Sequence, residues 1–337
     1  MLLLQAAAMA LPRPCAAQAD AVQLTFPLDC RIGATCMVQN YVDHDPGRGA
    51  HDYACGYLSY DGHKGTDIRL PDIAAMRRGV AVLAAAPGRV RAQRDGMDDI
   101  NVRTIGKATI AGREAGNSVV VDQGGGWEVQ YAHLRKGSVA VKVGELVRAG
   151  QKIGLVGLSG NTGFPHLHIE VRFEGRTVDP FVGLGSPGQC APGERPLWTP
   201  EALAALAYAP AGVIGAGFAG ALPKYEDGSV DADAFVPLTP DAPQFIFWIQ
   251  LFGARANDVE VLRLIGPDGQ IMAERRVAIP ENRATWVLYA GKRRSGAGWP
   301  PGNYRAEYAL YRGPEATKVT EAIRVYTVEA HSDDAAR

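Results

Sequence analysis

The sequence lacks several patterns that would assign it to a common class of protein. It has no segment of 18 or more consecutive apolar residues, so no transmembrane helix is expected. It has no stripe of Lys and Arg, and its net charge is only -1, so nucleic acid is not an expected partner. The HExxH motif is absent, which excludes that class of metalloprotease. Paired CxxC motifs are absent too, which argues against a zinc site built from thiolates.

The composition instead favours a β-rich protein with a substantial core. The chain has 337 residues, of which 47% are hydrophobic, and this length favours about two domains. Forty glycines and 22 prolines indicate many turns. Short alternating segments separated by these turns are typical of antiparallel sheets.

The first 19 residues have the pattern of a signal peptide. They are apolar and rich in alanine, and Ala17-Gln18-Ala19 resembles a cleavage site, although no Lys or Arg precedes the apolar stretch. The alternative is a buried first helix, but Pro12 and Pro14 would break it. We therefore expect residues 1–19 to be a signal peptide and the mature protein to be exported, either periplasmic or secreted.

Cysteine usage agrees with an oxidising compartment. Cys15 lies in the signal segment, which leaves Cys30, Cys36, Cys55 and Cys190. Four cysteines allow three pairings, and the sequence does not choose among them. We expect Cys30 to pair with Cys36, and Cys55 with Cys190. A metal site that uses Cys55 is the less favoured alternative.

The pattern along the chain predicts two β regions joined by a linker. Residues 20–190 would form the first domain, with a turn-rich lead-in over 20–60 and strands between 79 and 172. The expected strands are VAVLAAAPGRVRAQ, NSVVVDQ, WEVQYAHL, SVAVKVG, QKIGLVG and HLHIEVRF. Residues 93–116 look like a long insertion between strands, which is usually functional or mobile.

The second region follows a segment dense in Pro and Gly. Residues 191–210 are the expected linker, with one or two helical turns in EALAALAYA. From residue 211 to 332, short alternating segments predict an accessory β-sandwich. Its aromatic residues are expected in the core, and no chemistry is evident there. A wall or protein partner for this region is expected from position alone.

Only seven histidines are present, and four of them fall in three short motifs. His63 and Asp67 lie in GHKGTDI, His133 in YAHL, and His166 and His168 in PHLHIEV. Residues two apart in a strand point to the same face, so both His166 and His168 would enter one site. Gly65 lets the backbone bend so that His63 and Asp67 converge.

This set fits a catalytic zinc, which needs three protein ligands and one open position. His63, Asp67 and His168 can supply the ligands, while His133 or His166 can accept a proton from water. Taken singly, each motif is better explained by a surface ion pair or by a core histidine. The joint pattern, in order and set among strands and glycine turns, favours the Zn²⁺ site.

The segments GHKGTDI, YAHL and SGNTGFPHLHIEV resemble the lysostaphin-type (LytM-like) zinc metallopeptidases over roughly residues 60–182. The resemblance implies a small antiparallel β fold with a zinc-floored groove, and hydrolysis of peptide bonds in peptidoglycan. It also implies that the metal ligands are His63, Asp67 and His168, and that the catalytic pair is His133 and His166. LPDIAAMRRG and residues 93–116 are longer than is usual, so we expect them to border the groove and influence which bond is cut.

Two other functions fit parts of the sequence. A non-catalytic relative that binds the wall and activates another hydrolase would typically have lost metal ligands, whereas this sequence retains them all. VGELVRAGQKIG also resembles a biotinyl or lipoyl carrier, but Lys142 and Lys152 do not lie at a suitable hairpin tip. The sequence therefore favours a zinc endopeptidase.

Overall fold

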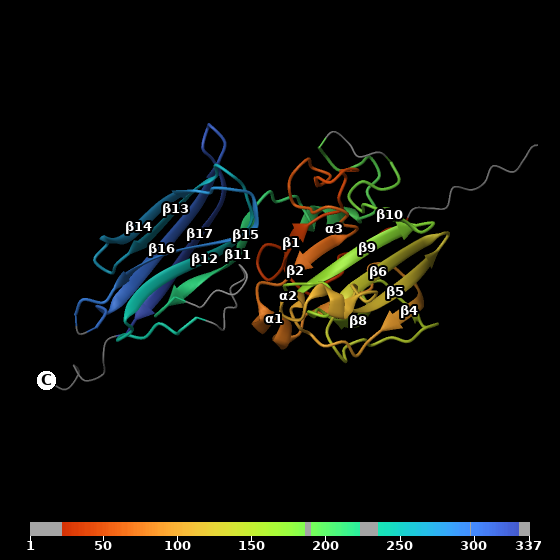
Figure 1. Ribbon diagram of the computed structural model, residues 1–337, viewed down its shortest axis with the longest axis horizontal. Coiled ribbons are helices and arrows are strands. Elements are labelled where there is room, and N and C mark those ends of the chain that lie inside the picture. Colours follow the sequence, from red (N-terminus) through yellow and green to blue (C-terminus); the bar gives the residue numbers. More distant parts are fainter. Residues whose placement is uncertain (1–21, 186–189, 223–234, 297, 330–337) are drawn as a thin grey trace, which may run out of the picture.

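The protein is mainly β, as expected, and its sheets are antiparallel (Figure 1). The computed structural model describes residues 22–185, 190–222, 235–296 and 298–329. The expected signal peptide at 1–19 lies outside the described residues, as do parts of the expected region 211–332. In the described residues, no helix is long and apolar enough to span a membrane.

The N-terminal part is built on one large sheet with the strand order β1-β2-β9-β6-β5-β4-β7, in which β10 also pairs with β9. A two-stranded sheet of β3 and β8 lies beside it. The strands are β1 Met37–Asn40, β2 Thr66–Arg69, β3 Ala81–Leu83, β4 Gly88–Arg94, β5 Asn117–Gly124, β6 Trp127–Leu134, β7 Leu146–Val147, β8 Lys152–Leu155, β9 His166–Phe173 and β10 Arg176–Val178.

Alternation along β9 shows why this sheet forms. Leu167, Ile169 and Val171 are fully buried and belong to the first hydrophobic core. His166 and His168 alternate with them and therefore lie on the opposite face. The expectation that the two histidines share a face is confirmed, and the core beneath them fixes the register of the strand.

Two expected strands differ in the structure. The segment SVAVKVG is not a strand. The next strand in the chain is the short β7. Val141 is nevertheless buried in the core, so its apolar character reflects packing without a ladder. The segment VAVLAAAPGRVRAQ divides into β3 and β4 in different sheets, since Ala84, Ala85 and Ala86 turn the chain through the core.

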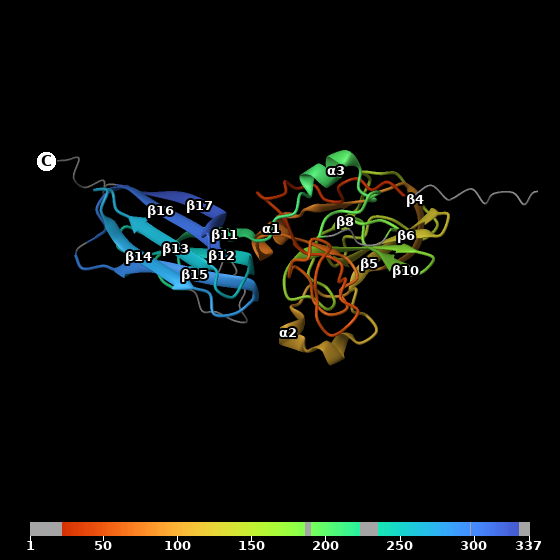
Figure 2. The ribbon, with the colours of Figure 1, turned by 90° about the horizontal axis from the view of Figure 1, so that it is seen from above.

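Short helices occupy the two stretches that seemed long in the sequence. Residues 70–79 contain α1, Ile73–Arg78, whose first turn is capped by Asp72. Residues 93–116 contain α2, Val102–Ile105, and a 3-10 turn, Lys107–Ile110, which project from the side of the domain (Figure 2). Asp95 and Asp99 accept backbone N–H groups of residues 136, 137, 139 and 158, so the first part of this insertion is fixed to the loops that follow β6 and β8.

The C-terminal part contains two sheets around a second core. After α3, Pro200–Ala205, one sheet has the order β11-β12-β15 and the other β14-β13-β16-β17. Their strands are β11 Gly212–Ala219, β12 Gln244–Ala254, β13 Val259–Ile265, β14 Ile271–Ala278, β15 Arg283–Arg293, β16 Gly302–Arg312 and β17 Thr317–Val328. Ile214 and Phe252 pack with the first core, so the two parts are in contact.

Two disulfides have the expected pairing. Cys30 pairs with Cys36, six residues away, and Cys55 pairs with Cys190, 135 residues away. The second bond joins the loop before His63 to the segment that follows the last strand of the first part. It therefore encloses most of the large sheet in one covalent loop.

We predict that the long-range disulfide contributes more stability than the short one. In the loop-entropy model, closing these loops is worth about 5 and about 2 kcal/mol respectively. Denaturant unfolding should therefore show a larger loss for the double variant Cys55→Ala, Cys190→Ala than for Cys30→Ala, Cys36→Ala. Equal losses, or the reverse order, would contradict this ranking.

A buried carboxylate marks the second core. Glu260 on β13 is fully buried and accepts hydrogen bonds from Trp286 Nε1 at 2.8 Å and from the Tyr308 hydroxyl at 3.2 Å. Burial raises the pKa of Glu260 above its ordinary value of 4.5, and these two hydrogen bonds only partly oppose the effect. The folded state therefore favours the protonated form more than the unfolded chain does.

It follows that Glu260 contributes most stability below pH 4.5 and loses it as the pH rises through the higher folded-state pKa. The stability of the wild type relative to Glu260→Gln should fall between acidic and neutral pH, as measured by denaturant unfolding at each pH. Glu329→Gln, at an exposed position, serves as the control. If the wild type instead becomes more stable relative to Glu260→Gln as the pH rises, the predicted direction of the effect is wrong.

Candidate metal centre

Two paired strands bring the candidate ligands together. Asp67 on β2 is directly opposite His168 on β9 in the antiparallel ladder. His63 lies four residues before Asp67, in the loop that leads into β2. Gly65 stands between them, where an added Cβ would lie 2.6 Å from the Ile169 carbonyl oxygen and 2.7 Å from the His168 ring. Only glycine fits so close to these atoms. Gly65 therefore allows the loop that carries His63 to pack against His168, and it also lets the chain bend between His63 and Asp67.

The donor atoms of these three residues converge on one point. His63 Nε2 lies 3.1 Å from Asp67 Oδ1 and 3.2 Å from His168 Nδ1, and the last two atoms are 2.8 Å apart. A tetrahedral zinc ion with bonds of about 2.0–2.1 Å separates its ligand atoms by about 3.3 Å. Two nitrogens and one carboxylate oxygen at these spacings fit the donor set of a zinc ion.

Neighbouring groups hold these ligands in orientation. The Nδ1–H of His63 donates to the Tyr41 carbonyl oxygen at 2.7 Å, which leaves the Nε2 lone pair directed at the site. Asn40 Nδ2 donates to Asp67 Oδ2 at 2.9 Å, so the other carboxylate oxygen faces the histidines. Asn40 and Asp67 are both buried and are paired across β1 and β2.

The electrostatics of the site favour an ionised Asp67. Burial alone would raise the pKa of its carboxyl, but the imidazoles of His63 and His166 and the hydrogen bonds of His166 and His168 hold that pKa well below its usual range. Burial likewise opposes protonation of His63, yet the charge of Asp67 outweighs burial and raises the pKa of His63. A carboxylate among imidazoles is a site that attracts a cation.

The other two histidines lie beside this cluster. The Nδ1–H of His133 donates to the Ser159 carbonyl oxygen at 2.8 Å, and the Nδ1–H of His166 donates to the Phe164 carbonyl oxygen at 3.0 Å. Their rings are 4.7 Å apart. Because each Nδ1 donates its proton to a carbonyl, Nε2 is the nitrogen of each ring that can gain or lose a proton, and Nε2 of His166 faces Asp67 Oδ1 at 3.4 Å and can donate to it when protonated.

His133 has an unusual backbone and an unusual acidity. Its φ is 61°, a left-handed conformation that non-glycine residues seldom adopt and that is often found at functional sites. Burial, and then the neighbouring His166 and His168, lower the pKa of His133 well below its usual value. It is therefore neutral near pH 7, with a nitrogen that can accept a proton.

His168 belongs to two overlapping donor groups. One comprises His63, Asp67 and His168, and the other His133, His166 and His168, and each offers donor atoms that lie within 4.8 Å of one another. Of the two groups, the first contains a carboxylate and has the three tight spacings given above. A divalent cation is better neutralised there than among three neutral imidazoles.

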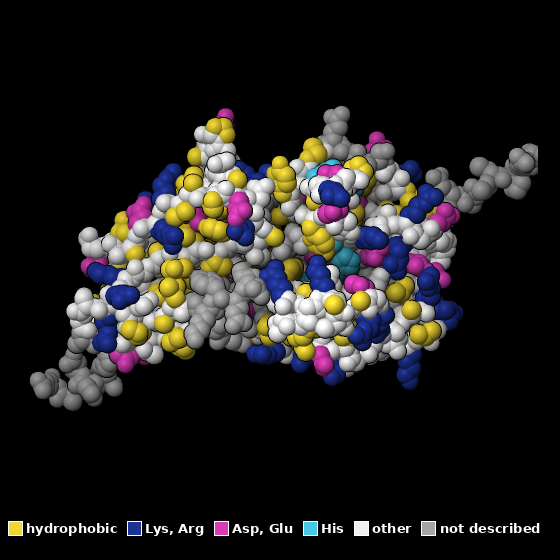
Figure 3. All heavy atoms as spheres, in the orientation of Figure 1, with side chains coloured by type: hydrophobic (Ala, Val, Ile, Leu, Met, Phe, Trp, Pro, Cys, Tyr) yellow, Lys and Arg dark blue, Asp and Glu magenta, His cyan; other side chains and the backbone are white. Residues whose placement is uncertain are grey.

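Figure 3 shows a recess in which histidine side chains are visible. Lys and Arg side chains lie around this recess. The ring of Tyr60 lies 4.3 Å from that of His63. The 93–116 insertion contacts the loops of the second histidine pair, since Val102 N donates to the Thr162 carbonyl and His133 N donates to the Ala115 carbonyl. The insertion is therefore a fixed neighbour of the site.

All five residues singled out in the sequence thus lie in one cluster, but sequence reasoning missed Asn40 and Tyr60. Asn40 is 27 residues from Asp67, in a lead-in that showed no strand signal, and only the register of β1 reveals it. Tyr60 precedes His63 by three residues in SYDGH, and its aromatic character alone did not distinguish it from core residues.

Part of the chain is similar to known peptidases and to proteins that act on peptidoglycan. Residues 61–180 match the model of peptidase family M23. Peptidoglycan DD-endopeptidase ShyB of Vibrio cholerae is 45% identical over 65 residues, which are 19% of this chain and 15% of that protein. Murein hydrolase activator EnvC of Escherichia coli is 46% identical over 67 residues, 20% of this chain and 16% of that protein.

Among solved structures, a zinc-containing peptidase from Vibrio cholerae aligns with a TM-score of 0.32 and 27% identity, over 47% of this chain and 39% of that one. The chain spans less than a fifth of the length of the curated relatives named above. The shared region includes all five site residues, from His63 to His168. Residues 61–180 of the chain therefore form a domain of the peptidase M23 (LytM-like) type.

Proposed function

We propose that this protein is a zinc-dependent endopeptidase that hydrolyses peptide bonds of peptidoglycan, in the stem peptide or in a cross-link. The observation that carries the proposal is the convergence of His63 Nε2, Asp67 Oδ1 and His168 Nδ1, each within 3.2 Å of the other two. In this proposal these three residues are the metal ligands, and His133 and His166 are the catalytic pair.

Zinc bound there would lower the pKa of a water molecule to about 7 and polarise the carbonyl of the bond to be cut. The residues of the chain supply the rest. The neutral Nε2 of His133 accepts a proton from the attacking water, and the protonated ring can return it to the leaving amine. His166 Nε2 faces the same space and hydrogen-bonds the developing charge when protonated.

Preorganisation supports this division of roles. The backbone carbonyls of Ser159 and Phe164 fix the tautomers of His133 and His166, and the Tyr41 carbonyl fixes that of His63. None of the three rings therefore needs to reorient before it acts. These contacts favour a catalytic site over one that merely retains histidines for packing.

A non-catalytic activator is the second candidate, because one relative is named a murein hydrolase activator. Activity as an enzyme is favoured here because the donor set is complete and each ligand is oriented by a hydrogen bond or by the opposing strand. Replacement of any histidine ligand by an apolar residue would have left the buried Asp67 without one of its partners, at a substantial cost in stability.

We also propose where the protein acts and what the second part of the chain does. Two disulfides agree with export to the periplasm or beyond the cell. We propose that residues 211–332 form an accessory domain, joined by a linker at 191–210, that contacts the wall or a protein partner. The second core within β11–β17 supports a separate unit, which contacts the first part through Ile214 and Phe252.

We predict that the two donor groups respond differently to substitution. Asp67→Asn should lose most bound zinc and all detectable hydrolysis, because the anionic ligand is gone. His133→Gln should keep about one zinc per chain and lose about 10²–10⁴-fold in turnover, since it removes a proton acceptor and not a ligand. Metal analysis of both purified variants, with circular dichroism to verify folding, checks this. If His133→Gln loses the metal while Asp67→Asn keeps it, the ligand assignment is reversed.

Mass spectrometry of muropeptides tests the function as a whole. The full-length protein, incubated with purified peptidoglycan, should release peptide-cleaved fragments, and a zinc chelator should abolish the release. Adding back zinc should restore it. If no fragments appear but an added amidase becomes more active in both the presence and absence of the chelator, the activator function is correct instead.

A further inference from the structure

The segment 41–45 holds the turn that carries His63, although it lies outside the residues that match the peptidase family. The Nδ1–H of His63 donates to the Tyr41 carbonyl oxygen at 2.7 Å, and the backbone N–H of Asp43 donates to the His63 carbonyl oxygen at 2.8 Å. The Asp43 carboxylate also accepts the backbone N–H of Gly62 at 2.9 Å. The position of His63 therefore depends on what fixes the segment 41–45.

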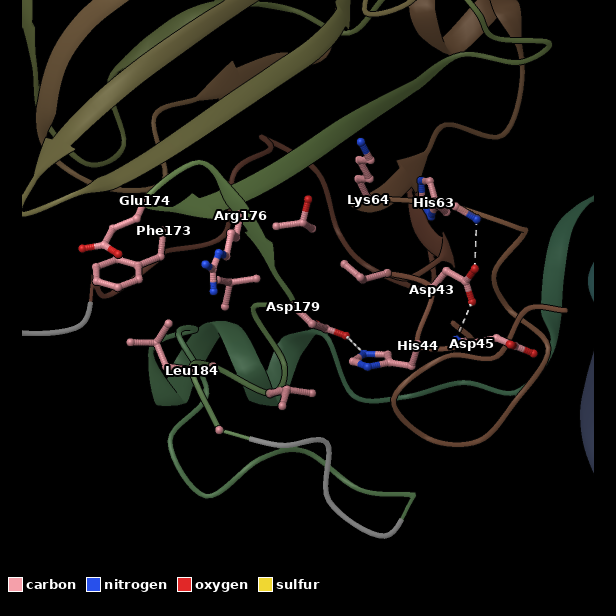
Figure 4. A pocket seen from close by; sticks show the side chains of 17 residues that line it. Asp43, His44, Asp45, His63, Lys64, Phe173, Glu174, Arg176, Asp179 and Leu184 are labelled. Atoms are coloured by element: carbon pink, nitrogen blue, oxygen red, sulfur yellow. Dashed lines mark hydrogen bonds and ion pairs between the residues drawn. The ribbon is translucent and has the colours of Figure 1, made fainter. Parts of the chain in front are cut away.

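One support of this segment lies on the wall of a cavity of about 570 Å³ beside His63. His44 Nε2 lies 2.7 Å from Asp179 Oδ2, and Asp179, which is buried, also accepts the backbone N–H of Phe181 at 2.8 Å. Dashed lines in Figure 4 mark the pair of His44 with Asp179 and the hydrogen bonds of Asp43. The segment is thereby joined to the residues that directly follow β10.

The ring of Tyr41 supplies a second support. Tyr41 is 1% exposed, and its ring centroid lies 5.3 Å from that of Tyr53, 5.2 Å from that of Phe181 and 5.4 Å from that of Tyr208. Tyr208 follows α3 in the segment that joins the two parts of the chain, beyond the residues that match the family. This segment therefore reaches back to the residue whose carbonyl oxygen binds His63.

The hydroxyl of Tyr208 supports the backbone of Tyr41 by a separate route. It donates to Asp52 Oδ2 at 2.8 Å, and the same oxygen accepts the backbone N–H of Leu58 at 3.0 Å. The Leu58 carbonyl oxygen in turn accepts the backbone N–H of Tyr41 at 2.8 Å. An added Cβ at Gly56 would lie 1.9 Å from the Tyr208 hydroxyl, so a larger residue there would displace it. Ring and hydroxyl of Tyr208 thus both act on Tyr41.

We propose that Tyr208 is a positioning residue for the metal ligand His63 and acts through the peptide of Tyr41. The inference rests on the proposed zinc site, in which His63 is a ligand. A hydrogen bond from the second ring nitrogen fixes the orientation and tautomer of a metal-binding histidine, and loss of such a partner typically lowers metal affinity about 10–100-fold. Tyr208 is one step further from the metal, so its effect should fall at the lower end of that range.

Zinc dissociation constants of the full-length protein, measured by competition with a chromophoric chelator, test the proposal. Tyr208→Leu removes the ring contact and the hydroxyl hydrogen bond, and it should raise the Kd about tenfold. Tyr208→Phe keeps the ring and loses only the hydrogen bond, so it should raise the Kd about threefold. If Tyr208→Leu does not fold, Tyr208→Phe still decides, because a wild-type Kd in that variant would overturn the proposal.

Tyr131→Phe is the matched control for loss of stability. Tyr131 is buried in the same core as Tyr41, and its hydroxyl accepts the backbone N–H of Ala85 at 2.7 Å, away from the contacts that lead to His63. This variant should lose stability in denaturant unfolding yet keep the zinc Kd within about twofold of the wild type. If it raises the Kd as much as Tyr208→Phe does, loss of stability alone explains the change and the positioning role is wrong.

NMR spectroscopy of the zinc-loaded protein gives a readout at His63 itself. Its Nδ1–H proton should exchange with water about tenfold faster in Tyr208→Leu than in the wild type, because the Tyr41 carbonyl oxygen is less firmly held. The Nδ1–H proton of His133, which is bonded to the Ser159 carbonyl oxygen, should exchange at the wild-type rate. Equal exchange at His63 in the two proteins would contradict the proposal.

Zinc binding and hydrolysis separate this inference from the proposed function. If the zinc Kd rises in the predicted order but the wild type cleaves no peptidoglycan, the endopeptidase function fails and the role of Tyr208 stands. If the wild type cleaves peptidoglycan and both Tyr208 variants bind zinc as tightly as it does, the role of Tyr208 fails and the endopeptidase function stands.

Discussion

The buried carboxylate of Asp67 is the constraint on which the rest of the site depends. It is 2% exposed, and a charge so far from water is tolerated only when it is paired and hydrogen-bonded. Asn40 from β1 satisfies one oxygen, and His63, His166 and His168 surround the other. Three neighbouring strands must therefore be in register before the charge can be accommodated, and the same register gathers the donor atoms for a cation.

The second feature of the site is that hydrogen bonds to backbone carbonyl oxygens fix the tautomers of three histidines. His63, His133 and His166 each donate Nδ1–H to a carbonyl oxygen of the surrounding loops. Those loops are fixed in turn. Asp95 and Asp99 join the insertion at 93–116 to the loops that follow β6 and β8, and backbone hydrogen bonds join it to the loop before His166. The stretch that looked like a candidate mobile insertion in the sequence therefore acts as a fixed wall.

Much of this could be predicted from the sequence, because alternation and short motifs are local signals. The shared face of His166 and His168, the convergence of His63 and Asp67 around Gly65, and both disulfide pairings were expected and are present. The predictions that failed depend on pairing between strands that are distant in the sequence. The segment 138–144 has strand-like alternation but no partner strand, whereas β1 has a partner strand but showed no strand signal in its sequence. Asn40 could not be found for the same reason.

The central claim is that a metal ion is bound by the group that contains the carboxylate. The two overlapping donor groups share His168, so activity measurements alone do not separate them. A crystal structure of the zinc-loaded protein, with anomalous diffraction recorded on both sides of the zinc absorption edge, does. The account predicts a single anomalous peak bonded to His63 Nε2, Asp67 Oδ1 and His168 Nδ1, at about 2.0–2.2 Å from each. A peak bonded to His133, His166 and His168, with Asp67 outside the coordination sphere, would contradict it.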